Sequence, residues 1–135
     1  MSTPFHVIII TPDKTLFDGE TEQIIVRSTE GDIGIMANHV SYCASIPSSP
    51  LKIKLPDGSY RVAAISSGMI KTSKEKTTII ATAAEWADEI DIEWAKRSEE
   101  DAREKLKTYQ SGLEFDRADL KLKRALNRIN VSQMK

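Results

Sequence analysis

The sequence lacks the features that mark a secreted or membrane-spanning protein. It has one cysteine, Cys43, in 135 residues, so no internal disulfide framework can form and a reducing compartment is expected. No apolar run approaches the roughly 20 residues that a helix needs to span a bilayer. The first four residues show no basic segment followed by an apolar core, so we expect neither a signal peptide nor an organelle-targeting segment.

An excess of charge is also lacking. The 19 basic and 20 acidic residues leave a net charge of −1 at pH 7, so no global field favours nucleic acid or an anionic membrane. No known nucleic-acid-reading motif and no interleaving of aromatic with basic residues is present, and we expect no nucleic-acid partner. The 40% of apolar residues permits one domain with a real core, or a small domain with an appendage.

Proline and glycine are nearly missing from the last part of the chain. All five prolines and five of the six glycines precede residue 85, whereas residues 85–135 hold one glycine and 23 charged side chains. This tail has nine acids and three bases in residues 85–104, then eight bases and three acids in residues 105–135. The composition predicts two domains, residues 1–84 and residues 85–135.

The first domain has the pattern of a β-sandwich or a flattened barrel. Short runs of β-branched and apolar residues alternate with turn residues, and Pro56-Asp57-Gly58 is a strong hairpin signal. The strands are predicted at 5–11, 15–17, 23–28, 33–36, 51–55, 60–65, 68–72 and 77–82.

The second domain has helical periodicity and is predicted to be an antiparallel hairpin. Asp91 is the expected N-cap of the first helix, and Ser111 with Glu114 has capping-box spacing for the second. At about 25 cal/mol per Å² of buried apolar surface, the narrow apolar stripes give only a few kcal/mol net of ordering entropy, so we hypothesise a mobile hairpin. The stripes are Ile90, Trp94, Ala102, Leu106 and Tyr109 in the first helix, and Ala118, Leu122, Ala125 and Ile129 in the second.

Candidate catalytic and metal-binding groups are sparse. His39 and Cys43 are four residues apart, but no motif places an Asn or Asp to complete a nucleophile and base, and we interpret Cys43 as a small buried apolar residue. His6, His39, Cys43 and the scattered carboxylates have no zinc spacing and form no calcium loop. We therefore expect neither an enzyme nor a metal site.

Two polar segments each allow two interpretations. Residues 28–39 are either a hairpin with a bulge or an exposed acidic loop that meets a basic partner, with Glu30, Asp32 and His39 as its polar points. The predicted second helix is basic, and this surface is either solvated or binds an acidic partner. Its cations are Arg117, Lys121, Lys123, Arg124 and Arg128.

Seven short segments follow one another in a distinctive order. They are Thr11-Pro12-Asp13, Glu30 to Ile35, Asn38-His39, Ser67 to Ile70, Thr78 to Ile80, Ala83 to Glu85, and Leu122 to Arg128. In this order and with matching lengths, they together resemble the epsilon subunit of F-type ATP synthase of the bacterial type. The resemblance covers nearly the whole chain.

The resemblance implies a sandwich of about ten strands followed by a two-helix hairpin, in a non-catalytic subunit of the rotating central stalk. The sandwich would bind the gamma subunit and sit on the c-ring, with Glu30, Asp32 and His39 facing the polar loops of that ring. Membrane association would arise only through the complex, at the cytoplasmic face of a bacterial plasma membrane.

The resemblance also implies that the hairpin regulates. Folded down, it packs on the sandwich; extended, it enters the head of alpha and beta subunits and blocks ATP hydrolysis. Its basic residues Arg117, Lys121, Lys123, Arg124 and Arg128 would then meet an acidic segment of the beta subunit. Weak packing along the narrow apolar stripes suits such a switch, since the folded-down and extended states must lie within a few kcal/mol of each other.

Some bacterial members of this family bind ATP in the folded-down form. The matching positions here are Glu85, Ile90, Asp91, Ala95, Arg124 and Arg128. Trp94 replaces the motif arginine, and Asp101 occupies a position suited to a further arginine. Because a triphosphate needs cations, we predict weak or absent ATP binding and no other cofactor. Arg97 and Arg103 are the cations left to compensate, and no spacing assigns that role to either.

A different class of function stays open from the residues alone. The chain would then be a free-standing β-sandwich adaptor that captures an acidic protein partner with its basic second helix. Recovery of gamma and c subunits in a pull-down separates the two functions.

Overall fold

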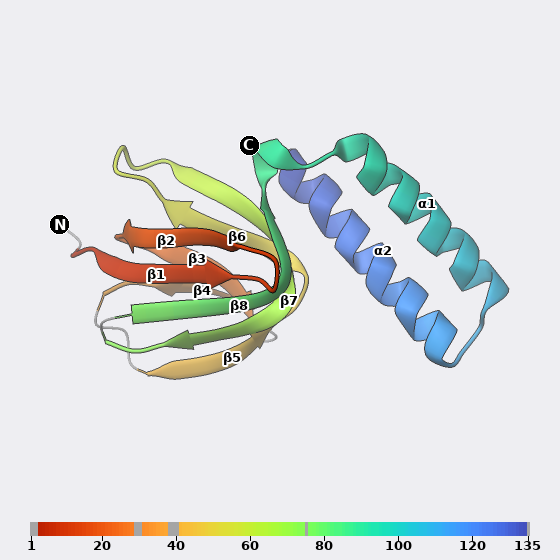
Figure 1. The fold of residues 1–135 in the computed structure, drawn as a ribbon, viewed down its shortest axis with the longest axis horizontal. Helices are drawn as coiled ribbons and strands as arrows, with labels where there is room; N and C mark the ends of the chain where they lie inside the picture. The colour runs from red at the N-terminus through yellow and green to blue at the C-terminus, as the bar shows by residue number, and fades with distance from the viewer. Residues whose placement is uncertain (1–2, 29–30, 38–40, 75, 135) are drawn as a thin grey trace. The chain divides into compact units, whose positions relative to one another are not determined.

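A computed structural model describes residues 3–28, 31–37, 41–74 and 76–134 (Figure 1). The chain divides into two compact units, Met1–Trp86 and Ala87–Lys135, which are described separately below. The predicted boundary after residue 84 falls two residues before the end of the last strand. Among the described residues, no helix combines the length and the apolar character needed to cross a bilayer.

The first unit is a β-sandwich, as predicted, and its described residues form eight strands where about ten were expected. One hydrogen-bonded sheet runs in the order β2-β1-β8-β7-β6-β3-β4, and β5 pairs with β7 off this path. Only the β1–β8 pairing is parallel among the described strands. The strands are β1 (Phe5–Ile10), β2 (Thr15–Thr21), β3 (Ile24–Ser28), β4 (Gly31–Ile35), β5 (Tyr42–Ile46), β6 (Ser49–Lys54), β7 (Tyr60–Thr72) and β8 (Lys76–Trp86).

Strand β7 pairs with three other strands, β5, β6 and β8. Its first half pairs with β6, and its second half pairs with β5. The prediction of separate strands at 60–65 and 68–72 is wrong, because both belong to one strand, Tyr60–Thr72, which keeps the same register with β8 from Ala63–Trp86 to Thr72–Thr77. Strand β5 was not predicted, and the second predicted strand ends too early, at Asp18-Gly19, because β1 pairs with β2 as far as Thr21.

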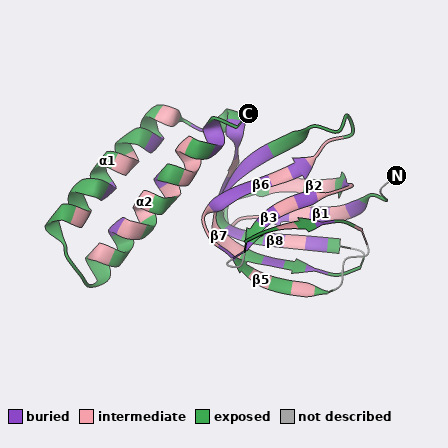
Figure 2. Ribbon diagram, turned by 180° about the vertical axis from the view of Figure 1, so that it is seen from behind, coloured by how far each residue is buried: buried purple, intermediate pink, exposed green. Residues whose placement is uncertain are grey.

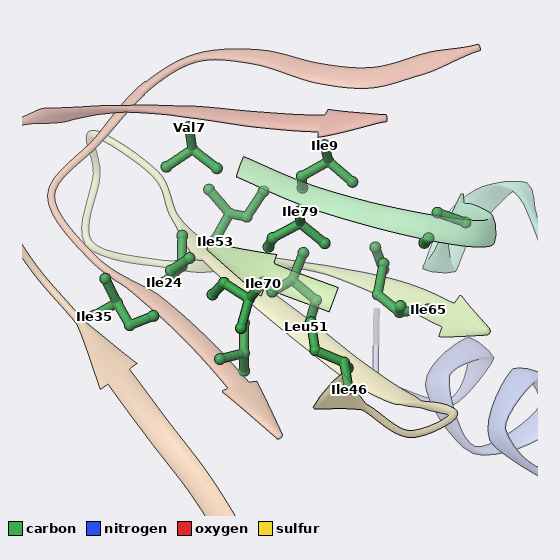
Figure 3. Close-up of a cluster of buried hydrophobic side chains, with 14 of the residues drawn as sticks. Val7, Ile9, Ile24, Ile35, Ile46, Leu51, Ile53, Ile65, Ile70 and Ile79 are labelled. Carbon is green, nitrogen blue, oxygen red and sulfur yellow. The ribbon is translucent and has the colours of Figure 1, made fainter. Parts of the chain in front are cut away.

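Isoleucine is the commonest side chain in the core of this unit (Figure 3). Strand β1 shows how the sequence determines this, since alternate residues Phe5, Val7 and Ile9 are buried and the residues between them are half-buried. At the end of β8, the buried ring of Trp86 meets Phe17 edge-on, with 6.3 Å between centroids. The guanidinium of Arg61 lies 3.7 Å from the centroid of the Trp86 ring.

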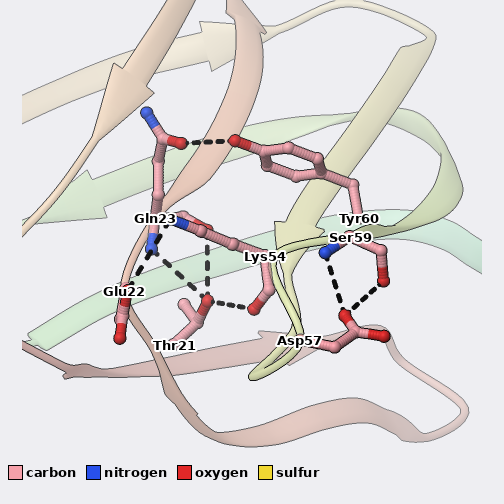
Figure 4. Close-up of polar contacts among 7 residues, drawn as sticks. All are labelled: Thr21, Glu22, Gln23, Lys54, Asp57, Ser59 and Tyr60. Carbon is pink, nitrogen blue, oxygen red and sulfur yellow. Dashed lines mark hydrogen bonds and ion pairs between the residues drawn. The ribbon is translucent and has the colours of Figure 1, made fainter. Parts of the chain in front are cut away.

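Short polar contacts fix the predicted turn at residues 56–58 (Figure 4). Gly58 adopts a φ of 90°, which favours glycine. The Asp57 carboxylate accepts hydrogen bonds from the Ser59 amide at 2.9 Å and the Ser59 hydroxyl at 2.5 Å, and these bonds lower the pKa of Asp57. Nearby, the Thr21 hydroxyl donates to the Lys54 carbonyl at 2.7 Å, which ties the end of β2 to the end of β6.

The second unit is the predicted helical hairpin, with a short 3₁₀ turn η1 (Ala87–Glu89), helix α1 (Ile92–Thr108) and helix α2 (Leu113–Ser132). Asp91 caps α1 as predicted, because its carboxylate accepts a hydrogen bond from the Trp94 amide at 3.1 Å. The predicted capping box of α2 is wrong. Its N-cap is Gly112, at a φ of 87°, and no side chain makes a capping hydrogen bond there.

Alanines form most of the buried stripe of the hairpin. Most of α1 is exposed, whereas α2 divides mainly between exposed and half-buried residues (Figure 2). The predicted stripe of α2 is confirmed at Ala118 and Ala125, which are buried, while Leu122 and Ile129 are half-buried. The predicted stripe of α1 is wrong at Trp94 and Tyr109, which are 51% and 41% exposed. Successive residues of a helix point about 100° apart, so burial of Ala95 turns the neighbouring indole of Trp94 outward. The buried residues of the two helices are Ala95, Ala102, Ala118, Ala125, Val131 and Ser132.

Candidate functional site

Two cations of helix α2 pair with acids of the same helix. Arg117 lies 3.7 Å from the carboxylate of Glu114, and Lys123 lies 3.0 Å from that of Asp119. Both pairs are well exposed, so each contributes at most about 1 kcal/mol. These two cations are therefore presented on the surface of α2 with their acids beside them.

Two other cations of α2 contact helix α1. The Lys121 amine donates a hydrogen bond to the carboxylate of Asp101, and the guanidinium carbon of Arg128 lies 4.7 Å from the centroid of the Trp94 ring. The hydrogen bonds of Lys121 and Lys105 to its ionised form lower the pKa of Asp101. Lys121 and Arg128 therefore face α1, unlike Arg117 and Lys123.

A shallow groove of about 250 Å³ lies beside these cross-helix contacts, lined by Trp94, Arg97, Ser98, Asp101 and Lys121. Of the two cations left to compensate for a missing arginine, Arg97 lines this groove. Arg103 instead points to Glu99 of its own helix, with 3.7 Å between guanidinium and carboxylate.

The candidate ATP-binding residues fall in both units. Glu85 belongs to β8 in the first unit. In the hairpin, Ile90 and Ala95 are buried, and the Asp91 carboxylate is used to cap α1. On α2, Arg128 lies over Trp94, while the Nε atom of Arg124 is shielded from solvent and has no hydrogen-bond partner among the described residues.

The candidate c-ring contact is described only in part. Asp32 lies on β4 at one edge of the sheet, and its carboxylate is 3.0 Å from Nε of Arg27 on β3. Half of each side chain is exposed, so the pair can exchange with another charged partner. The other two predicted residues, Glu30 and His39, lie outside the described residues.

An apolar row crosses three strands on the outside of the sandwich. Ile10 pairs with Ile80 between β1 and β8, and Ile80 pairs with Met69 between β8 and β7. Met69 is 52% exposed and Ile80 is 55% exposed. The row lines a groove of about 470 Å³ whose walls are almost entirely apolar, and the sequence analysis did not single it out.

Cys43 is exposed, which corrects its interpretation as a buried residue. It lies on β5 between Tyr42 and Ala44, which both pack against the core, so alternation along the strand turns the thiol outward. Within the described ranges, His, Cys, Asp and Glu side chains form no group of three that could hold a metal ion.

Two family models match the chain in succession. The model for the ATP synthase delta/epsilon chain β-sandwich domain matches residues 4–87, and the model for its long α-helix domain matches residues 88–133. The chain belongs to the ATP synthase delta/epsilon chain family. The predicted resemblance to the epsilon subunit and the predicted order of sandwich and hairpin are thereby confirmed.

Similar proteins of this family extend over the same length. The ATP synthase epsilon chain of Ruminococcus albus is 46% identical over 97% of this chain and 98% of its own length. That of Caldanaerobacter subterraneus is 38% identical over 98% of this chain and 96% of its own length. Among solved structures, a chain of the Euglena gracilis mitochondrial ATP synthase has a TM-score of 0.77 at 20% identity, covering 100% of this chain and 84% of that chain. At such identity the likeness shows the fold alone.

From the sequence, Trp94 and Asp101 were predicted only to be departures from an ATP-binding motif. The structure gives both residues a partner on α2. The spacing of these residues could have indicated the two cross-helix contacts, because Trp94 and Asp101 are seven residues apart, and so are Lys121 and Arg128. Residues seven apart return to nearly the same side of a helix.

Proposed function

We propose that the chain is a non-catalytic rotor subunit of the central stalk, which couples the gamma subunit to the c-ring and inhibits ATP hydrolysis through its hairpin. The complex would hold it at the cytoplasmic face of a bacterial plasma membrane. Membership of the delta/epsilon family over nearly the whole chain supports the assembly role.

The observation that carries the inhibitory role is the arrangement of cations on α2. Arg117 and Lys123 are 68% and 65% exposed, and weak surface pairs exchange readily for an acidic partner. In the extended state, α2 would enter the catalytic head beside the gamma subunit and meet an acidic segment of the beta subunit. The five cations named from the sequence are the contact residues.

The apolar row of the sandwich supports docking of the gamma subunit. Exposed side chains of Met69 and Ile80 leave apolar area in water, which a partner surface would bury favourably. Because the row lies on three adjacent strands, it offers a rigid surface to that partner.

The edge of the sheet near Asp32 is proposed to face the c-ring. The carboxylate of Asp32 is paired with Arg27 in the isolated chain, so contact with a basic loop requires exchange of one cation for another. Such an exchange changes rate and specificity more than affinity.

ATP is proposed to bind weakly or not at all. Asp101 places a negative charge in the groove beside Trp94, and the Arg128 guanidinium lies over the Trp94 ring. A triphosphate would be repelled by Asp101, and it would have to draw the Arg128 guanidinium away from the Trp94 ring. Among the described residues, Arg97 and Lys121 are the cations that line this groove.

Deletion of residues 87–135 tests the inhibitory role. The assembled enzyme carrying the truncated chain should hydrolyse ATP faster than the enzyme with the full chain, while the gamma subunit and the c-ring remain bound. An unchanged hydrolysis rate in a correctly assembled complex would remove the inhibitory role and leave assembly and coupling.

A further inference from the structure

Helix α1 holds two cations of helix α2 through contacts that exist only while the helices lie side by side. Asp101 accepts a hydrogen bond from Lys121, and the Trp94 ring lies under the guanidinium of Arg128. Arg117 and Lys123 differ, because their acids belong to α2 and travel with it.

The two cross-helix contacts lie on one edge of the hairpin. A step of seven residues from Trp94 to Asp101 along α1 matches a step of seven from Arg128 to Lys121 along α2. Seven residues are nearly two full turns, so both contacts stay in register in the antiparallel pair. The groove lined by Trp94, Arg97, Ser98, Asp101 and Lys121 lies along this edge.

The chemistry of α1 at this edge matches what an acidic protein surface offers. A carboxylate binds an amine by a charge-assisted hydrogen bond, and an aromatic face attracts a guanidinium. Trp94 and Asp101 are about half exposed, so both contacts are weak enough to be exchanged. An acidic segment and α1 would therefore compete for the same two cations.

We propose that Trp94 and Asp101 mask Lys121 and Arg128 in the closed hairpin, and so set how strongly α2 binds an acidic polypeptide. The proposal rests on the inhibitory function proposed above for α2. Trp94 and Asp101 do not touch the partner; they are positioning residues that act by withholding cations from it.

The test compares two double variants of the full-length chain. The masking variant, Trp94→Leu with Asp101→Asn, loses the ring and the carboxylate. The control variant, Trp94→Phe with Glu100→Gln, keeps an aromatic ring and removes one negative charge from the neighbouring exposed residue of α1. Far-ultraviolet circular dichroism establishes that both variants keep their helix content.

The probe is poly-L-glutamate, titrated into each full-length chain. Masking predicts about threefold to tenfold tighter binding by the masking variant than by the control, as expected for two exposed contacts. Adding Lys121→Gln and Arg128→Gln to the masking variant must remove this gain. Equal affinities of the two double variants, or a gain that survives loss of both cations, would overturn the proposal.

The same variants in the assembled enzyme separate this inference from the proposed function. With masking and inhibition both operating, the masking variant inhibits ATP hydrolysis about threefold to tenfold more strongly than the control. A gain in poly-L-glutamate binding together with no effect of deleting residues 87–135 rejects the inhibitory role and keeps the masking. A faster truncated enzyme together with equal double variants keeps the inhibitory role and rejects the masking.

Discussion

Met69 and Ile80 face each other across β7 and β8, yet each side chain is more than half exposed. The residue before Ile80, Ile79, points into the core and is fully buried. Two isoleucines adjacent in sequence therefore have different roles in stability.

We predict that Ile79→Ala lowers the free energy of unfolding by about 2–5 kcal/mol, because it leaves a cavity in the core. Ile80→Ala is expected to cost less than about 1 kcal/mol in the isolated chain, since it removes exposed surface. Urea unfolding, followed by Trp86 fluorescence in a Trp94→Phe background, measures both.

Ile80→Ala should nevertheless reduce recovery of the gamma subunit in co-purification, and undiminished recovery would count against docking at this row.

Gly68 packs against the backbone of β8. A Cβ atom added to Gly68 would lie 2.1 Å from the carbonyl oxygen of Ile80, and neither strand can move without disturbing the core. Gly68→Ala is therefore expected to destabilise the sandwich by about 1–3 kcal/mol or more. Gly19→Ala is the control, because its nearest neighbour would be the Phe17 ring at 3.4 Å. Equal unfolding midpoints in urea for the two variants would contradict this reading of the contact.

The two helix starts of the hairpin predict opposite outcomes for capping residues. Asp91→Ala removes the carboxylate that caps α1 and should cost about 1 kcal/mol of helix stability. Ser111→Ala should have almost no effect, because no side chain caps α2. Amide hydrogen exchange in the first turn of each helix distinguishes the two variants. Faster exchange in α2 of Ser111→Ala would show that Ser111 does cap this helix.

The hairpin start shows where sequence patterns succeed and where they fail. The spacing of Asp91 before a helical run is a local signal, and the structure bears it out. The spacing of Ser111 and Glu114 is equally local, but the chain enters α2 through Gly112 at a positive φ, which places the serine outside the cap. Backbone conformation in a short connection depends on how the two helices pack, which local spacing does not encode.

In the sandwich, too, local patterns predict some features and long-range contacts decide others. Alternation along β1 predicts its buried face, whereas the residues Ser66 and Ser67 suggest a break that long-range pairing of β7 with β8 overrides. At the site, composition located the cations of α2. It did not show that Lys121 and Arg128 are held by α1, because that depends on the register between two helices.

The Asp101–Lys121 pair makes the hairpin sensitive to acid. Lysine contacts hold the pKa of Asp101 below its ordinary value of 3.8, so the unfolded chain binds the proton at higher pH than the folded hairpin. The stabilisation is complete above about pH 3.8 and is lost as the pH falls through the lowered folded pKa. The stability difference between the wild-type chain and Asp101→Asn should be constant near neutral pH and shrink below about pH 4. Urea unfolding followed by far-ultraviolet circular dichroism measures this stability difference. A difference that persists in strong acid would show that the Asp101–Lys121 pair does not stabilise the hairpin.

Titration with ATP tests whether the hairpin has lost nucleotide binding. Isothermal titration of the full-length chain should show no binding of low-micromolar affinity, because Asp101 repels phosphate and Trp94 supplies no positive charge. Replacing both residues by arginine, Trp94→Arg with Asp101→Arg, adds two cations to the groove lined by Arg97 and Lys121. This variant should bind ATP at least about tenfold more tightly, the change that 1.4 kcal/mol produces.

The matched control for this titration adds the same charge elsewhere on α1. Glu100→Arg with Glu104→Arg changes two exposed acids that do not line the groove formed by Trp94, Asp101 and Lys121. If affinity depends on where the cations stand, this control should bind ATP no better than the wild-type chain. Equal gains in both variants would mean that net charge alone attracts the nucleotide, and tight binding by the unaltered chain would show that Arg97 replaces the missing arginine.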